Sequence, residues 1–322
     1  MTQASIGMRA GAQAHDERVA AAEAAFFGSE VDLSKPPLLP PSVAQLIARN
    51  PDIQTLNAVA LKLVRVLDDP NSSASTVESA LRADVGLASR IMRTANSSLY
   101  GAASGAGSVR QAVARIGFES VRAIALAAAM SDGNQLTSTT ATMLARHSVA
   151  VAVLSRLLAY QQKKADADLC FVAGLLHDIG KFMLLQSLGD DYEDVAVAAA
   201  AVGWNFCELE RALIGADHAE VGASLAYGWG LHPRILMAIR LHHQLGTMYT
   251  AELDPLTVCL VATVRLADDM FRAERDPDGD LAVEFRPVQS EARDMLELDD
   301  AVLKQVWTDF HTHYNEACLV LL

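Results

Sequence analysis

The sequence lacks closely spaced cysteines. Its 322 residues include four, Cys170, Cys207, Cys259 and Cys318, and no two of them form a Cys-x-x-Cys pair. Disulfide scaffolds, zinc ribbons and thioredoxin-type motifs depend on such pairs, so the spacing argues against those classes and fits a reducing compartment. A chain of this length can also bury enough apolar surface to fold without a covalent or metal staple.

Proline is missing from residues 71 to 232, although the chain has ten prolines. Proteins built from turns and strands use proline at corners and on edge strands, so a gap of this length is untypical of them. The same stretch is rich in alanine and leucine, which are strong helix formers. The sequence therefore predicts an all-α protein.

A net positive charge is lacking as well, since the formal charge is −13. Nucleic-acid-binding domains usually carry a basic surface, so DNA and RNA are not expected as general partners. The charge is unevenly divided: residues 35–130 hold ten Lys/Arg and six Asp/Glu (net +4), and residues 131–322 hold 14 and 28 (net −14). This difference predicts two subdomains with different surfaces.

Long uncharged apolar runs are also lacking. The most apolar stretch, residues 195–207, is shorter than the roughly 18 residues of a membrane-spanning helix. The N-terminal residues do not show the basic, apolar and cleavage-site order of a secretory signal. We therefore expect a cytoplasmic protein without a membrane partner.

Prolines and polar breaks divide the chain into parts. KPPLLPPS at 35–42 cannot be helical and marks the start of the folded body. The polar segment at 131–142 separates two sets of helices. The predicted parts are a flexible lead-in (1–34), a domain at 35–275 made of an N-terminal helical subdomain (35–130) and a second subdomain (131–275), and a C-terminal helical extension (276–322).

Local patterns predict where some helices begin and end. Ser75 with Glu78 has the spacing of a capping box, and so has Asp217 with Glu220. Gly117 is expected to end a helix in a left-handed conformation. One unbroken helix is expected over residues 168–188.

Histidine and aspartate are the residues of the second half that could bind a metal or take part in catalysis. Imidazole nitrogens and carboxylate oxygens suit divalent Fe, Mn, Ni or Zn, and a carboxylate can bridge two ions. Each histidine alone is explained more simply as a helix cap or a core residue. Their recurrence at intervals of about one helical hairpin, with an aspartate in an apolar helix, favours a metal site. The candidates are His147, which begins its predicted helix, His177, Asp178, His218, His242, His243 and Asp268.

Lys181 follows Asp178 by three residues, so both lie near one helix face, where the ammonium group can meet a phosphate oxygen. In a two-metal site, paired ions would polarise a phosphoryl group and activate a water. The remaining polar residues fit structural roles. Asp217 and Glu220 are expected as caps, Asp269 as a solvated charge, Cys170 and Cys207 in the core, and His15, His311 and His313 on the surface.

With these residues, the second half resembles the HD superfamily of metal-dependent phosphohydrolases. Its pattern is a His, a His-Asp pair, further His residues and a late Asp, and all seven candidates match the ligand positions of its dinuclear members. The resemblance implies that Asp178 bridges or anchors the metals. Lys181 matches the lysine of the HDxxK motif and is implied to steady the phosphate.

The first half is similar to the lead-in of the HDOD domain, the HD-related output domain. The similar segments are LRADVGLASRIMRTANSSLYG at 81–101 and SVRQAVARIGFESVRAIALA at 108–127, with GLLHDIGKFMLL and LIGADHAEVGASLAYGWGL further on. The resemblance covers about residues 38–275. It implies a helical bundle of HD type with an N-terminal helical subdomain.

Three departures narrow the expected activity. Gln244 stands where cyclic di-GMP phosphodiesterases of the superfamily carry Glu, and their Gly-Tyr-Pro signature is absent. Met143 stands where trinuclear relatives carry Glu. The sequence therefore argues against a cyclic di-GMP hydrolase and against a three-metal site.

Two functions remain open. HDOD domains are bacterial signalling modules, so the first hypothesis is a non-catalytic module with a retained metal site. It would act through a signalling protein or a small phosphorylated ligand, with Arg90, Arg93 and Arg122 of the basic half expected to contact the partner. The alternative is a metal-dependent phosphohydrolase on a nucleotide or another phosphoester, with Asp178 and Lys181 as its catalytic residues.

Overall fold

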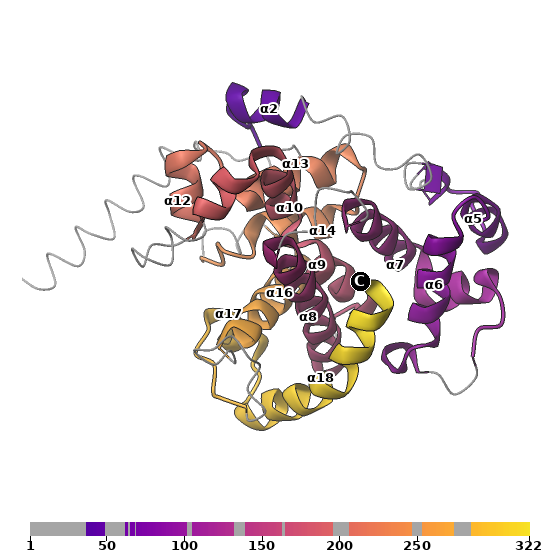
Figure 1. The fold of residues 1–322 in the computed structure, drawn as a ribbon. Coiled ribbons are helices and arrows are strands. Elements are labelled where there is room, and N and C mark those ends of the chain that lie inside the picture. Colours follow the sequence, from indigo (N-terminus) through magenta and orange to yellow (C-terminus); the bar gives the residue numbers. More distant parts are fainter. Residues whose placement is uncertain are drawn as a thin grey trace, which may run out of the picture. The chain divides into compact units, whose positions relative to one another are not determined.

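The computed structural model describes residues 37–48, 62–63, 65–67, 69–101, 105–131, 139–162, 165–195, 206–246, 253–273 and 285–322. Within these residues the chain forms helices and no strand, which confirms the all-α prediction (Figure 1). The predicted lead-in at 1–34 lies outside the described part. The helices are α2 (Pro41–Ala48), α5 (Ala74–Leu81), α6 (Val85–Asn96), the 3-10 helix η1 (Ser98–Tyr100), α7 (Val109–Ser131), α8 (Thr139–Gln162), α9 (Ala167–Leu176), α10 (Ile179–Leu188), α12 (Phe206–Leu213), α13 (His218–Gly228), α14 (Pro233–Leu241), α16 (Pro255–Ala273), α17 (Glu291–Leu296) and α18 (Asp300–Leu321).

Helix α8 lies at the centre of the second half and packs against α9, α10, α16 and α18 (Figure 1). By length and composition it is the one helix in the described residues that could cross a membrane. Its apolar side chains from Val149 to Leu154 are fully covered by the neighbouring helices. The apolar sequence of α8 is thus that of a core helix, which is consistent with its place in the fold.

The two capping predictions have different outcomes. Asp217 caps α13 as predicted, because its carboxylate accepts from the backbone N–H of Glu220 at 2.8 Å while Glu220 accepts from the N–H of Asp217 at 2.9 Å. The cap of α5 is Ser73 and not Ser75. The hydroxyl of Thr76 takes the reciprocal role expected of Glu78, accepting from the N–H of Ser73 at 2.8 Å. The helix therefore begins two residues earlier than predicted.

Gly117 does have a positive φ, as expected, but it does not end its helix in the left-handed helical region. Its φ of 78° and ψ of 164° belong to a region that only glycine occupies readily. Helical structure resumes directly afterwards, so α7 is two helical stretches joined at a kink. The predicted helix end at Gly117 is therefore confirmed, and the predicted left-handed helical conformation of the cap is not.

Two glycines bring helix backbones into direct contact. A Cβ atom built on Gly174 of α9 would lie 2.8 Å from the carbonyl oxygen of Val151 in α8. A Cβ on Gly180 of α10 would lie 1.9 Å from the carbonyl oxygen of His218 in α13. Any larger residue would push these helices apart. The glycines therefore set the spacing of the helices that carry the candidate ligands.

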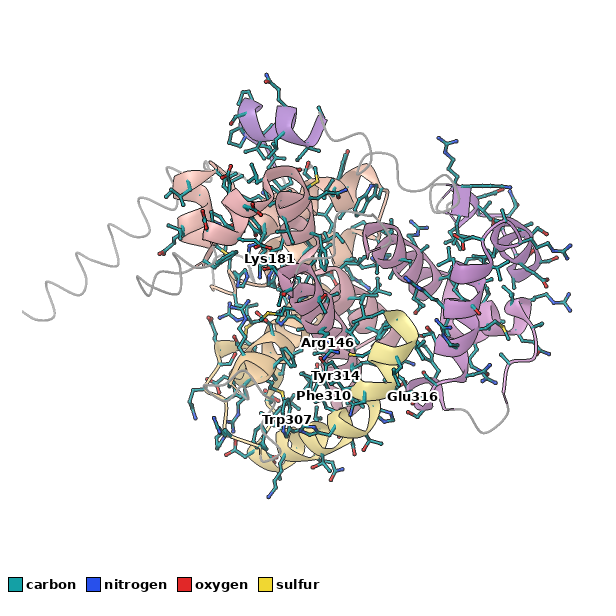
Figure 2. The ribbon with its side chains drawn as sticks, in the orientation of Figure 1. Arg146, Lys181, Trp307, Phe310, Tyr314 and Glu316 are labelled. Atoms are coloured by element: carbon teal, nitrogen blue, oxygen red, sulfur yellow. The ribbon has the colours of Figure 1, made fainter. Side chains whose placement is uncertain are left out.

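An aromatic ladder on α18 supports α8 and α16. The rings of Trp307, Phe310 and Tyr314 stack in succession with centroids 4.9 Å apart at each step, and Figure 2 shows them following one another along the helix. Phe271 of α16 lies 6.2 Å from Phe310 and 5.4 Å from the ring of His147. The C-terminal helix thus buttresses a candidate ligand through one intervening ring.

Polar contacts join α18 to the first half of the chain. The hydroxyl of Ser98 donates to Glu316 at 2.5 Å and lies 2.6 Å from Nδ1 of His313, while Arg93 reaches the carbonyl oxygen of Val320 at 3.5 Å. His313 and His311 are half-buried and not surface residues as expected, since His311 packs edge-on against Trp307.

The last two residues of the chain line a cavity. Leu321 and Leu322 face Ser148 of α8 and Ile179 of α10 across it. These two neighbours directly follow the candidate ligands His147 and Asp178 in the sequence.

Candidate metal centre

The structure brings all seven candidate ligands together from five parts of the fold. His147 lies in the third turn of α8, and not at the start of a helix as predicted, because helical structure already begins at Thr139. The other six lie at the junction of α9 and α10 (His177 and Asp178), at the first residue of α13 (His218), directly after α14 (His242 and His243) and within α16 (Asp268).

The predicted single helix over 168–188 is interrupted at this junction. His177 ends α9, and Asp178 has a non-helical backbone with φ −100° and ψ 17° before α10 begins. The interruption leaves both side chains fully buried in the centre of the site. The helix prediction failed because the apolar pattern continues unchanged across the break.

Asp178 stands between two groups of side chains, one at each carboxylate oxygen. Oδ1 lies 3.2 Å from Nε2 of His218 and 3.6 Å from Nε2 of His242. Oδ2 lies 3.3 Å from Nε2 of His177 and 3.4 Å from Nε2 of His147. We name these the His218 group (His218, His242 and His243) and the His147 group (His147, His177 and Asp268).

Each group is completed by a third side chain. Nε2 of His243 lies 3.0 Å from Nε2 of His218, and Oδ1 of Asp268 lies 3.1 Å from Nε2 of His147. With one ligand atom from each residue, Asp178 and the His218 group fall within a 4.8 Å span that suits a metal ion, and so do Asp178, His147 and His177. One carboxylate shared by both sets is the arrangement expected of a bridging ligand.

Two of the imidazoles are held by backbone carbonyl groups on the side away from Asp178. Nδ1 of His177 and Nδ1 of His242 each lie 2.8 Å from a backbone carbonyl oxygen, of Gly174 and Ile239 respectively. A carbonyl oxygen only accepts, so both Nδ1 atoms donate, and in the neutral ring each Nε2 atom then presents a lone pair to the site. Such outer contacts orient histidines that ligate metals.

The buried polar atoms fit a bound cation. Oδ1 of Asp178 and Nε2 of His242 are buried and have no hydrogen-bond partner among the described residues. Buried acceptors without partners are rare in folded proteins, because each loses its hydration. A divalent ion between these two atoms would satisfy both, and the mixture of nitrogen and oxygen donors suits Fe, Mn, Ni or Zn.

Two cations hold the carboxylates ionised. Nζ of Lys181 donates to Oδ2 of Asp178 at 2.7 Å, and Nε of Arg272 donates to Oδ1 of Asp268 at 2.8 Å. Burial opposes ionisation of Asp178, but His177 and Lys181 bring its pKa well below the usual value. Burial likewise opposes ionisation of Asp268, and Arg272 outweighs it, so that its pKa is also well below the usual value.

Two of the candidate ligands keep some exposed surface. The side chain of His147 is 15% exposed, whereas the side chains of His177 and Asp178 have no exposed surface. His243 is half-buried. A ligand entering the site therefore meets His147 or His243 first.

Sequence reasoning missed Glu210 and Arg272. Glu210 of α12 is fully buried and bonds His218, but nothing in the sequence separates it from the neighbouring Glu208. Arg272 had a usable signal, because it follows Asp268 by four residues on the same helix face. Asp269, expected to be solvated, instead pairs with Arg265 at 2.9 Å and accepts from Ser290.

Two of the three arginines expected to contact a partner bond within the fold. Arg122 is 4% exposed and donates to the carbonyl oxygen of Gly230 at 3.0 Å, whereas Arg93 contacts α18 as described above but is exposed. Arg90 is half-buried. A partner surface that includes Arg122 is therefore incompatible with this fold. Cys170 and Cys207 are buried, as expected of core residues.

Comparison with known proteins agrees with this architecture. A curated protein from Treponema pallidum (strain Nichols), of uncharacterised function, is 25% identical over 77% of this chain, which spans only 48% of that protein. The crystal structure of an HDOD domain protein with unknown function from Geobacter sulfurreducens is 26% identical, covers 83% of this chain and 91% of its own, and has a TM-score of 0.59.

A proposed phosphohydrolase from Shewanella amazonensis SB2B has the same fold, with 21% identity, 88% and 98% coverage and a TM-score of 0.65. The family model of the HDOD domain matches residues 53–245. That match spans more than half of the sequence and includes His147, His177, Asp178, His218, His242 and His243. The chain therefore belongs to the HDOD domain family.

Proposed function

We propose that this HDOD protein binds two divalent metal ions and hydrolyses a phosphoester. One observation carries the proposal: each carboxylate oxygen of the buried Asp178 faces its own set of imidazoles. A core histidine needs one or two hydrogen-bond partners, and a structural role would not require five imidazoles around a single carboxylate.

The His147 group would hold one ion and the His218 group the other, with Asp178 shared between them. When bound, such ions supply Lewis-acid activation of the phosphoryl group and of the attacking water. The chain itself excludes bulk water, since most ligands are fully buried, and it keeps both carboxylates ionised through Lys181 and Arg272. Lys181 places a positive charge beside Asp178, where it would counter the charge of a phosphate oxygen.

A non-catalytic signalling role is the second candidate, and the burial of the site favours it. Asp178, His177, His218 and His242 have no exposed side-chain surface, so a substrate has little direct access to the centre. In this role the metal centre would bind a small phosphorylated ligand without turning it over, and a signalling protein would respond to the bound state.

Metal content is the first test, followed by turnover. Purified protein, as isolated and after reconstitution with Mn²⁺, Fe²⁺, Ni²⁺ or Zn²⁺, is analysed for metal, with two ions per chain expected. The loaded protein is then assayed with p-nitrophenyl phosphate, bis(p-nitrophenyl) phosphate and a panel of nucleotides. Wild type without metal after every reconstitution would overturn the proposal.

A matched pair of variants separates turnover from contamination. Asp268→Asn changes a member of the His147 group, and Asp269→Asn makes the same change one residue further on, outside both groups. We expect hydrolysis to fall at least tenfold in the first and to persist in the second. Equal rates in both would show that the activity does not come from this centre, and two bound ions without any turnover would favour the signalling role. Asp178→Ala is a poorer choice, because it leaves the buried ammonium of Lys181 unpaired, at a cost of about 3–5 kcal/mol.

A further inference from the structure

His218 differs from the other fixed imidazoles in what lies behind it. His177 and His242 donate from Nδ1 to neutral backbone carbonyls, whereas Nδ1 of His218 lies 2.5 Å from Oε2 of Glu210. Glu210 has no exposed surface. A carboxylate is a stronger acceptor than a carbonyl and makes the imidazole a better donor to a metal.

Glu210 is held in place by a short relay of hydrogen bonds. The hydroxyl of Tyr192 donates to Oε1 at 2.5 Å, and the backbone N–H of His218 donates to Oε2 at 3.0 Å. The relay links Tyr192, four residues after the end of α10, with the middle of α12 and the first residue of α13. The carboxylate therefore cannot turn away from the imidazole without losing two further buried contacts.

The carboxylate oxygens that face the two groups also differ in whether a lysine or arginine donates a hydrogen bond to them. In the His147 group, Oδ2 of Asp178 accepts from Lys181 and Oδ1 of Asp268 accepts from Arg272. A metal ion bound there shares both oxygens with a positive charge, which weakens its attraction. On the side of the His218 group, Oδ1 of Asp178 accepts no hydrogen bond among the described residues.

We propose that the two metal positions are unequal: the His218 group holds its ion more tightly, and Glu210 and Tyr192 are the positioning residues responsible. The inference rests on the proposed dinuclear centre. It follows from three features: a carboxylate behind one ligand, three imidazoles in place of two, and a shared oxygen to which no described lysine or arginine donates. The first ion to bind enters the His218 group, and the second enters the His147 group.

The test is a metal titration of the full chain. Metal-free protein is titrated with Zn²⁺ in competition with a chromogenic chelator, and native mass spectrometry counts the ions. Wild type is expected to bind in two separated steps. Glu210→Gln keeps the size and one acceptor oxygen and removes the charge, so it should weaken the first step about 10–100-fold and leave the second unchanged.

The matched control is Glu220→Gln, which makes the same change two residues after His218 in α13, at a residue that bonds the backbone of Asp217. It should leave both steps unchanged. A second readout needs no metal: the proton between His218 and Glu210 should give a strongly deshielded NMR resonance in wild type that disappears in Glu210→Gln and persists in Glu220→Gln.

The outcomes divide clearly. An effect of Glu210→Gln on the second step, on both steps equally or on neither overturns the inference while the dinuclear centre stands. Wild type that binds no Zn²⁺ overturns the centre itself and the inference with it. If Glu210→Gln does not fold, Tyr192→Phe replaces it; a smaller weakening of the first step alone supports the inference, and unchanged binding overturns it.

Discussion

Replacing Gly180 by alanine should damage both the fold and the candidate metal centre. Gly180 lies between Asp178 and Lys181 and packs against the backbone of α13. A Cβ atom there would lie 1.9 Å from the carbonyl oxygen of His218 and 2.8 Å from the backbone nitrogen of Gly222. Contacts below 3.0 Å are essentially never seen for Cβ atoms, so the two helices would have to separate by at least 1.1 Å, the difference between 3.0 and 1.9 Å.

The size of the effect follows from two opposing contributions. Overpacking a well-packed core costs about 1–3 kcal/mol, and a backbone carbonyl yields less readily than a flexible side chain, so we take the upper end. Alanine in place of glycine within a helix returns about 1 kcal/mol. The expected net loss in the free energy of unfolding is about 2 kcal/mol.

The site should be affected more strongly than the stability. His218 belongs to the backbone segment that must move, and its Nε2 lies 3.2 Å from Asp178. A functional site needs its groups placed to within about 0.5 Å, so a displacement twice as large should remove most of the affinity of the His218 group for Zn²⁺. Urea unfolding of the metal-free protein and the chelator competition titration measure the two effects separately.

Gly228→Ala is the control. Gly228 lies in α13, the helix that begins with His218, and a Cβ atom there meets nothing within 4 Å. It should leave metal binding unchanged and the stability equal or slightly higher. If Gly180→Ala retained the stability and the Zn²⁺ affinity of wild type, close contact of α10 with α13 would not be what positions His218, and the reasoning would be refuted.

Two further predictions concern residues away from the site. Arg122→Glu should lower the free energy of unfolding, measured with urea, by about 3 kcal/mol or more, because it places a buried carboxylate beside the carbonyl oxygen of Gly230. Arg110→Glu, at an exposed position of the same helix, should change the stability little, and equal stabilities of the two variants would contradict a structural role for Arg122. Burial raises the pKa of the Cys170 and Cys207 thiols, so both should react with iodoacetamide only after unfolding. Mass spectrometry measures the labelling, and equal labelling of native and unfolded protein would contradict the burial of these thiols.

The helical fold and the identity of the clustered residues could be predicted from the sequence because both depend on local patterns. The missing prolines and the abundant alanine predict helices, and the Asp217 cap is a four-residue pattern that fixes the start of α13. The break between His177 and Asp178 could not be predicted, since the apolar sequence runs through it. It is imposed by tertiary packing, which places Gly180 against α13.

The surroundings of the site were harder to predict than the ligands. Glu210 precedes His218 by eight residues, and only the approach of α12 to α13 brings their side chains within 2.5 Å. The net positive charge of the first half suggested a partner surface, but the sum of charges does not show that Arg122 is buried and bonded across to Gly230. Charge composition reports on a surface only for the residues that reach it.

The cavity lined by Leu321 and Leu322 lies between the end of α18 and residues next to the candidate ligands. Its other walls include Ser148 and Ile179, each one residue from a candidate ligand. A partner that binds the last turn of α18 and displaces these two leucines would therefore act on residues next to His147 and Asp178. Contacts made at the end of α18 thus have a physical path to the candidate metal centre.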